Sequence, residues 1–342
     1  MIVDCSKEIT GYYNEKVKLP ESERETLRGH RKANQDRLKN RLKEDKKPLP
    51  HSFVKQGSYS MHTMVQHPDN DYDIDDGVKF YKNELINSNK AEMTPQQVKE
   101  MVRDALKDER FEKQPQILKN CVRVFYEVGH HIDIPVYNTH ENPSGKIVCE
   151  LAGEEWRESN PEEITEWFNT AVIDKSPDDN NSRQMRRVVC LLKKWSRSRK
   201  TWDMPSGLTF SVLVDEKYVA REGRDDEALC NVMKAILLRL HSSLRVHLPV
   251  NSEEITKGIN DPKMIELRDK LGQAIEELKV LENPDCSKED ALKAWKSVFN
   301  DDFFEGGKKE KALAAPAIII SKSPTVPYVE IKKELKPWRS NE

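Results

Sequence analysis

Apolar and polar positions follow two different patterns in the two halves of the chain. The first half contains short runs of strand-like composition at residues 53–55, 121–128 and 131–138, and such runs between turn residues are typical of strands. Gly129 and His130 separate the last two runs, which predicts a hairpin. From residue 183 onward, apolar residues recur every three or four positions, as in amphipathic helices. The pattern predicts an α+β fold in which a sheet-containing half precedes a helical half.

Capping signals mark where several helices begin. Pro20 and the acidic residues after it start a very polar helix. Thr94 before Pro95 combines an N-cap with proline at the first helical position, and Asn160 before Pro161 does the same for a later helix. The expected helices cover residues 21–44, 94–106, 162–170, 183–200, 208–219, 225–244, 262–281 and 288–299.

A polar and acidic stretch at residues 174–182 separates the two halves and is expected to connect two lobes. We expect a core lobe at residues 1–175, which includes the polar N-terminal helix, and a helical lobe at residues 176–305. Residues 306–342 are rich in Lys and Pro around an apolar island at 312–320, and we expect them to form a partly docked tail.

Composition and net charge argue against several kinds of binding partner. The 342 residues include 57 Lys or Arg and 59 Asp or Glu, so the net charge is only −2 and a nucleic acid is not expected as an obligatory partner. The 6 cysteines are scattered without a C-x-x-C pair, which argues against a structural zinc site or a disulfide framework and favours a reducing cytoplasm. No apolar stretch approaches transmembrane length and the first residues lack a signal-peptide pattern, so no membrane partner is expected.

Acidic residues on two predicted strands are the first candidates for chemistry. Asp73 and Asp75 share a face of their strand, whereas Asp76 points to the other face. Two carboxylates held side by side repel each other unless a cation sits between them, and hard oxygen ligands suit Mg²⁺ or Mn²⁺. Asp133 supplies a third carboxylate, because its apolar neighbours alternate around it and leave it pointing away from the buried face. Such residues on neighbouring strands can hold two metal ions, which activate an attacking hydroxyl and stabilise a leaving pyrophosphate.

Gly57 and Ser58 follow the first strand-like run. Glycine lets the backbone approach a ligand closely, and the serine hydroxyl lies beside exposed N–H groups, which together suit a phosphate. Taken alone, Gly-Ser is more often a turn and the acidic run more often a solvated edge strand. The order of strand, Gly-Ser, short helix and Asp-x-Asp strand nevertheless resembles the nucleotidyltransferase superfamily, whose fold is polymerase-beta-like.

Longer motifs narrow this resemblance. The segments QGSYSMHT, DYDIDDGV and HHIDIPVY, within a similarity that extends over about residues 54–249, resemble the CD-NTase family. This family comprises bacterial relatives of animal cyclic GMP-AMP synthase and oligoadenylate synthase. The resemblance implies a bilobed enzyme with a polymerase-beta-like lobe on a mixed sheet and a helical lobe like that of oligoadenylate synthase.

The resemblance also implies an activity and its partners. It implies a nucleotidyltransferase that uses two Mg²⁺ or Mn²⁺ ions in the active site. The substrates would be nucleoside triphosphates, ATP or GTP or both, and the product a cyclic di- or trinucleotide messenger for anti-phage signalling. The implied protein partners are an effector that the product activates and a regulatory protein.

The resemblance assigns roles residue by residue. Asp73, Asp75 and Asp133 correspond to the catalytic and metal-binding carboxylates. His130 and His131 are expected to be structural instead, because adjacent residues on a strand point to opposite faces. Each polar residue that the family would use for nucleotide binding also has an ordinary interpretation, as a surface charge, a turn or a helix N-cap. Nucleotide contacts are implied for Gln56, Gly57, Ser58, Arg123, Asn160, Lys193 and Ser206.

Two positions depart from the family pattern. Met61, with Tyr59 nearby, stands where close relatives carry an aromatic residue that stacks on a base, so base choice is not carried over. The sequence ends in Ser340-Asn341-Glu342 rather than in glycine, which does not favour the C-terminal conjugation found in some relatives. Two other classes stay open. A polynucleotide or tRNA nucleotidyltransferase should show a basic RNA-binding face, and an inactive nucleotide-sensing relative should have lost a carboxylate.

Overall fold

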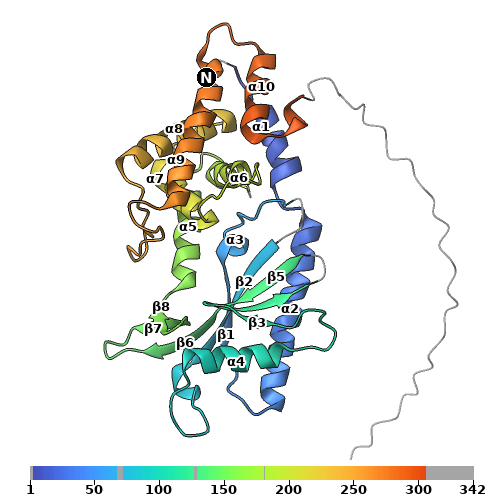
Figure 1. The fold of residues 1–342 in the computed structure, drawn as a ribbon, viewed down its shortest axis with the longest axis vertical. Coiled ribbons are helices and arrows are strands. Elements are labelled where there is room, and N and C mark those ends of the chain that lie inside the picture. Colours follow the sequence, from blue (N-terminus) through green and yellow to red (C-terminus); the bar gives the residue numbers. More distant parts are fainter. Residues whose placement is uncertain (1–2, 68–71, 127–128, 181, 306–342) are drawn as a thin grey trace, which may run out of the picture. The chain divides into compact units, whose positions relative to one another are not determined.

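The computed structural model describes residues 3–67, 72–126, 129–180 and 182–305. The predicted tail at 306–342, with its apolar island, lies outside the described residues. Within them, the first half of the chain forms one mixed sheet, with the strand order β3-β4-β5-β2-β6-β7-β8 and β1 paired to β2 (Figure 1). The strands are β1 Ser52–Gln56, β2 Tyr72–Tyr81, β3 Gln116–Ile117, β4 Val122–Phe125, β5 His130–Ile134, β6 Val136–Glu141, β7 Ile147–Ala152 and β8 Trp156–Glu158.

The long strand β2 organises this sheet. Its first half pairs in parallel with β5 and its second half in parallel with β6. The register is the same before and after Pro135, since Asp75 pairs with Asp133 and Val78 with Val136. β1 pairs antiparallel with β2 as well, and β4 pairs antiparallel with β5, as the predicted hairpin requires. The acidic part of β2 therefore lies within the sheet rather than at an exposed edge.

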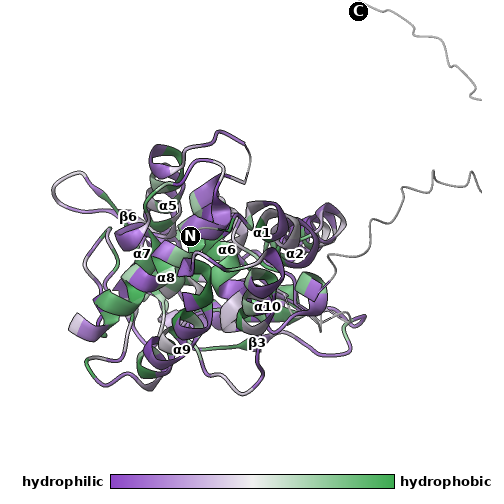
Figure 2. Ribbon diagram, turned by 90° about the horizontal axis from the view of Figure 1, so that it is seen from above, coloured by the Kyte–Doolittle hydropathy of each residue, from purple (hydrophilic) through white to green (hydrophobic). Residues whose placement is uncertain are grey.

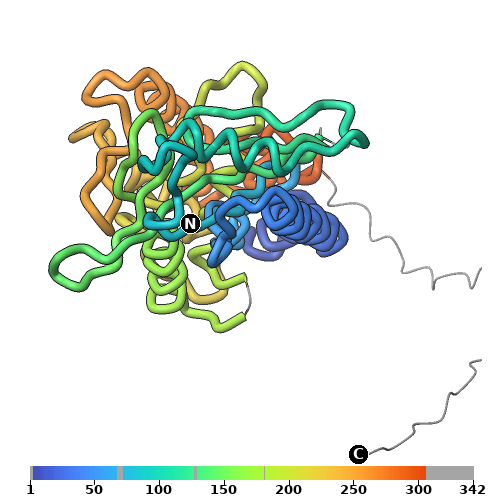
Figure 3. Tube along the Cα trace, turned by 90° about the horizontal axis from the view of Figure 1, so that it is seen from below, coloured from blue at the N-terminus to red at the C-terminus, as the bar shows by residue number. Residues whose placement is uncertain are grey.

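Helices α2 and α4 contact each other and cover one face of the sheet (Figure 3). α2 is polar along most of its length and buries a narrow row that includes Leu27, Leu38 and Leu42, which explains how so hydrophilic a segment packs. α4 begins with a capping box at Thr94. On this side of β2 lie Ile74 and the other apolar residues of the sheet core, so Asp73 and Asp75 are on the opposite face.

The second half of the chain packs around α6, which is buried on nearly all sides. Figure 2 shows α7, α8 and α10 around it. None of the helices in the described residues combines the length and apolar character needed to cross a bilayer. The helices are α1 Ser6–Tyr12, α2 Glu21–Glu44, α3 Gly57–Ser60, α4 Pro95–Leu106, α5 Pro161–Lys175, α6 Gln184–Ser196, α7 Gly207–Lys217, α8 Asp225–Ser242, α9 Pro262–Leu278 and α10 Lys288–Phe299, with π or 3₁₀ turns at Tyr13–Val17, Lys82–Glu84, Lys279–Glu282 and Asp302–Glu305.

Buried apolar side chains of the described residues fall into a sheet core, a helical core and a small cluster of Val54, Tyr137, Cys149 and Leu151. The helical core takes in Ile9 and Tyr12 of α1 and Phe168 and Val172 of α5, although both helices precede residue 176. The sheet core contains α2 and α4. The division into lobes at residues 175 and 176 stays a prediction, and helix α5 joins the two cores along the chain.

Candidate active site

The three candidate carboxylates come together through strand register. Asp75 and Asp133 are direct partners in the pairing of β2 with β5, and Asp73 lies two residues earlier on the same face. Asp76 is buried on the other face, where Gln35 Nε2 of α2 donates to both of its oxygens at 2.8 and 3.1 Å. The alternation read from the sequence thus separates Asp76 from the other acids.

The carboxyl group of Asp75 has a strongly raised pKa. Burial, followed by the charges of Asp133 and Asp73, raises the pKa of its carboxyl to about 7. Its side chain keeps some contact with solvent while protein atoms surround it closely. Arg123 acts in the opposite direction and lowers this pKa. The ionised form of Asp75 therefore needs additional positive charge nearby.

Arg123 is the cation that faces these acids. It lies opposite Asp133 in the pairing of β4 with β5, and its Nε and Nη2 groups donate to Asp133 Oδ1 and Oδ2 at 2.7 and 2.8 Å. Nη2 also lies 3.5 Å from Asp73 Oδ1. Hydrogen bonding to Asp133 raises the pKa of the guanidinium further above its usual value.

The histidine pair divides between the two faces of β5. His130 is buried and its Nε2 lies 3.4 Å from Glu23 of α2. His131 shares the face of Asp133, and its Nδ1 lies 3.5 Å from Asp73 Oδ1. The structural role predicted for both histidines did not anticipate that His131 lies close to Asp73. The alternation that selected Asp133 would also have placed His131 beside the acids, at the same spacing of two residues.

Gly57 brings the backbone against Asp75. Its φ is +63°, and a Cβ at this position would lie 2.0 Å from Asp75 Oδ2. Gln56, the residue opposite Asp75 in the pairing of β1 with β2, accepts a hydrogen bond from Tyr137 Oη at 2.9 Å. Ser58 follows Gly57 in the short helix α3. The structure therefore places Gln56 and Gly57 beside Asp75, and Ser58 is the next residue along the chain.

Lys193 reaches the same segment from the helical core. Its Nζ donates to the carbonyl of Thr63, after α3, at 2.5 Å, and the residue is only 4% exposed. Burial lowers the pKa of this ammonium to about 8. Gly207 makes room for it, since a Cβ there would lie 2.8 Å from Lys193 Cε. One segment thus touches both Asp75, through Gly57, and Lys193, through Thr63.

A cavity of about 580 Å³ opens beside Lys193. Its lining includes Ser206, which caps α7 by accepting a hydrogen bond from the Thr209 N–H at 3.4 Å. Further basic side chains line it: Arg197, Arg199 and Lys200. Asn160 is at another helix start, where it accepts a hydrogen bond from the Glu162 N–H at 3.2 Å and caps α5. Positive charge and the start of α7 give this cavity the character of an anion site.

The two residues considered for base stacking are both buried. Met61 belongs to the helical core, and its carbonyl accepts a hydrogen bond from Arg186 Nε at 3.1 Å. Tyr59 packs beneath the guanidinium groups of Arg24 and Arg31, each 5.8 Å from the ring centroid. Both side chains are therefore packed inside the protein and are not exposed for stacking on a base.

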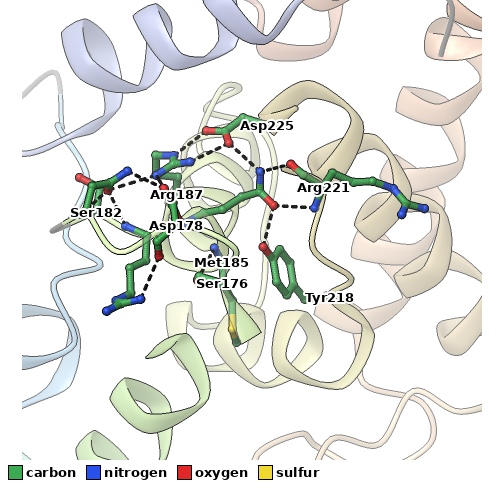
Figure 4. A network of polar contacts seen from close by, with 11 residues as sticks. Ser176, Asp178, Ser182, Met185, Arg187, Tyr218, Arg221 and Asp225 are labelled. Carbon is green, nitrogen blue, oxygen red and sulfur yellow. Dashed lines mark hydrogen bonds and ion pairs between the residues drawn. The ribbon is translucent and has the colours of Figure 1, made fainter. Parts of the chain in front are cut away.

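A buried polar network fixes the start of α6, the helix that carries Lys193 (Figure 4). Arg187 donates to both oxygens of Asp225 at 2.5 and 2.7 Å and to Asp178 at 2.6 Å. Gln184 accepts a hydrogen bond from Tyr218 Oη at 2.7 Å and donates to Asp225 at 3.0 Å. Part of the predicted linker is therefore tied to the helices that surround α6.

The acidic cluster has the donor atoms that hard divalent cations prefer. In the part of the chain that the structure describes, however, no group of His, Cys, Asp or Glu side chains is arranged to hold a metal ion. Asp73 and Asp133 turn toward Arg123 instead. The three carboxylates therefore suit a divalent cation chemically, but both oxygens of Asp133 already accept hydrogen bonds from Arg123.

Comparisons with known proteins support a nucleotidyltransferase domain and fold. Residues 51–137 match the family model of the cyclic GMP-AMP synthase DncV-like nucleotidyltransferase domain. The fold resembles that of a mutant of the Vibrio cholerae di-nucleotide cyclase DncV in complex with ATP, GTP and 5MTHFGLU2. That match has a TM-score of 0.71 and 17% identity over 88% of this chain and 97% of the other. The Vibrio cholerae cyclic AMP-GMP synthase in complex with the linear intermediate 5′ pppA(3′,5′)pG matches with a TM-score of 0.70 and 18% identity, over 88% and 96%.

These matches show the fold and the class of its nucleotidyltransferase domain. The mixed sheet and the matched domain are those of a nucleotidyltransferase, and the predicted α+β fold with a polymerase-beta-like lobe and a helical lobe is confirmed. The match of residues 51–137 to a DncV-like nucleotidyltransferase domain supports the CD-NTase family that the motifs indicated.

Proposed function

We propose that this protein joins ribonucleoside triphosphates, ATP or GTP or both, into a cyclic di- or trinucleotide. The observation that carries the proposal is the pairing of Asp75 with Asp133 across adjacent parallel strands, with Asp73 on the same face and Gly57 against Asp75. That arrangement is suited to nucleotidyl transfer with divalent cations. The solved structures with bound ATP, GTP and a linear dinucleotide are consistent with these substrates.

The acidic residues and the Gly-Ser turn are assigned different roles in the reaction. Asp73, Asp75 and Asp133 would hold Mg²⁺ or Mn²⁺, which when bound lowers the pKa of the acceptor hydroxyl and offsets charge on the leaving group. We assign the phosphates to the backbone and hydroxyl of Gly57 and Ser58. The acceptor hydroxyl gives its proton to solvent, its oxygen forms a bond to the α-phosphorus, the bond from that phosphorus to the oxygen that bridges to the β-phosphorus breaks, and pyrophosphate leaves with the electron pair. A second transfer on the linear product closes the ring.

Lys193 and Ser206 are assigned to the triphosphate. Both line the same basic cavity, and Lys193 also contacts the segment that follows the Gly-Ser turn. A triphosphate beside the buried ammonium would favour its charged form, because an opposite charge stabilises a cation in a poorly solvated site. Arg123, Gln56 and Asn160 are assigned to the nucleotide as well, as the family resemblance implies.

The biological setting follows from the family alone. We propose a cytoplasmic messenger synthase for anti-phage signalling, with an effector that the product activates. A polynucleotide or tRNA nucleotidyltransferase is less favoured because the chain carries a net charge of only −2. An inactive sensor is less favoured because the chain retains Asp73, Asp75 and Asp133.

Product analysis tests the proposal directly. The purified chain is incubated with the four labelled ribonucleoside triphosphates and Mg²⁺ or Mn²⁺, treated with phosphatase, and analysed by chromatography and mass spectrometry. Phosphatase-resistant cyclic species, absent from Asp75→Asn and present in the surface control Asp104→Asn, are expected. Linear or primer-extended products alone would favour the polymerase-like class. Absence of any product, with cell extract or phage lysate added, would favour the sensor.

A further inference from the structure

Arg123 engages the carboxylate that lies opposite it on the neighbouring strand. One guanidinium group contacts both oxygens of Asp133, at 2.7 and 2.8 Å, and approaches Asp73 at 3.5 Å. These are the oxygens through which Asp133 would bind a cation. Among the described residues, no group of three or more His, Cys, Asp or Glu side chains is arranged to hold a metal ion.

We propose that Arg123 competes with the divalent cation for Asp133, and that a nucleotide phosphate frees this carboxylate by taking over the guanidinium group. The inference rests on the proposed nucleotidyl-transfer function and adds the order in which the nucleotide and the cation bind. The nucleotide binds first and the cation then binds at Asp133.

Charge and geometry both make the competition strong. The guanidinium is permanently charged, and it counteracts the mutual repulsion of Asp73, Asp75 and Asp133. A divalent cation would perform the same task with the same oxygens, and two cations that close repel each other. Unless Arg123 gains a new partner, a metal ion at Asp133 would have to break the bidentate, charge-assisted contact between Arg123 and Asp133.

A phosphate is the natural alternative partner. The planar fork of arginine matches phosphate as well as carboxylate. The Arg123 side chain is 26% exposed and that of Asp133 only 13%, so the guanidinium is the more accessible member of the pair. The exchange needs only side-chain rotation, because strand pairing between β4 and β5 fixes the backbones of both residues.

Binding of Mn²⁺ to the metal-free full chain, followed by electron paramagnetic resonance without nucleotide, tests the competition. Arg123→Gln removes the charge, and Arg123→Lys keeps the charge but not the two-pronged contact. We expect both variants to bind Mn²⁺ at least about tenfold more tightly than the unmodified chain. Arg239→Gln removes an arginine that pairs with Glu216 at 2.8 Å in the helical half, and should leave Mn²⁺ affinity unchanged.

The same titration separates this inference from the proposed function. Equal affinity in the unmodified chain and Arg123→Gln would overturn the competition. A gain in Arg123→Gln without one in Arg123→Lys would also overturn it, because net charge alone would then account for the effect. Binding that Asp75→Asn abolishes would leave the proposed metal site standing in either case, whereas no binding in any variant would remove the proposed function too.

Binding of ATP in EDTA tests the release of Asp133. Asp133→Asn frees the guanidinium, so we expect this variant to bind ATP at least about tenfold more tightly than the unmodified chain. The gain should disappear when Arg123→Gln is added, in a double-mutant cycle. If Asp133→Asn gives the same gain with and without Arg123, the guanidinium does not pass to the phosphate and the proposed exchange is wrong.

Discussion

Asp75 and Asp133 are separated along the chain but stand opposite each other in the parallel pairing of β2 and β5. Hydrogen bonds across this pairing fix both backbones, so a shift of the main chain cannot move the two carboxylates apart to relieve their repulsion. Arg123 meets one of them from the next strand. This constraint governs how the acidic cluster responds to substitution, to pH and to added cations.

Asp75→Asn should abolish nucleotidyl transfer while keeping the fold. The amide has nearly the same shape but no charge, so a divalent cation loses a ligand, and we expect kcat to fall by more than about a hundredfold. Steady-state assays of pyrophosphate release measure this, with circular dichroism as the check on folding. Activity within a few-fold of the unmodified chain would remove Asp75 from the catalytic site.

The contribution of Asp75 to the stability of the metal-free protein should fall as pH rises. The pKa of Asp75 is about 7 in the folded chain, against 3.8 for an unperturbed aspartate, so the folded state binds its proton more tightly than the unfolded state. The associated stability is present below about pH 4 and is lost as pH rises through about 7, by on the order of 4 kcal/mol. Urea unfolding in EDTA at several pH values measures the slope.

Asp75→Asn serves as the control for this slope. It should flatten the pH dependence without removing it, because burial also raises the pKa of Asp76, to about 6. Adding Mn²⁺ at pH 8 should stabilise the unmodified chain more than Asp75→Asn. Identical slopes for the two chains in EDTA would show that Asp75 is not the group that titrates.

Gly57→Ala should disrupt the acidic cluster. The new Cβ would lie 2.0 Å from Asp75 Oδ2, and the backbone there has a φ of +63°. Gly223→Ala isolates the backbone effect, because Gly223 has a φ of +66° and no atom within 4 Å of an added Cβ. Each substitution should cost about 1–2 kcal/mol of stability from strain, but only Gly57→Ala should also lower kcat. Thermal unfolding and kinetic assays of both variants make the comparison.

Strand alternation made much of this site predictable, whereas long-range contacts did not. A period of two was enough to put Asp73 and Asp75 on one face and Asp76 on the other. The same rule applied to His131 would have placed it near Asp73, where it lies at 3.5 Å. Local sequence carries no information on the meeting of Lys193 with Thr63, which are 130 residues apart. It also does not show that α1, ahead of the sheet, packs in the helical core, because that depends on which apolar surface remains available after folding.

Lys193→Met should weaken nucleotide binding, with a smaller loss of stability because the Thr63 carbonyl loses its donor. The ammonium is buried and its pKa is lowered, so replacing it with an apolar chain of similar length removes a desolvated charge. A lost charge-assisted contact to a triphosphate is worth about 1.5–3 kcal/mol, which should raise KM about tenfold to a hundredfold. Lys194→Met, on the same helix with a 3.5 Å contact to the Gln66 carbonyl, is the control. Unchanged KM with reduced stability would make Lys193 purely structural.

The network at the start of α6 should behave as a buried ion pair whose halves depend on each other. Arg187→Met leaves Asp225, whose side chain is 4% exposed, without its charged partner, and we expect a loss of about 3–5 kcal/mol. Arg187→Met combined with Asp225→Leu should recover much of that loss, because no unpaired charge then remains buried. Urea unfolding of the two single variants and the double variant gives the interaction energy. Additive losses would mean that the contacts of Arg187 with Asp178, rather than with Asp225, hold this end of the helix in place.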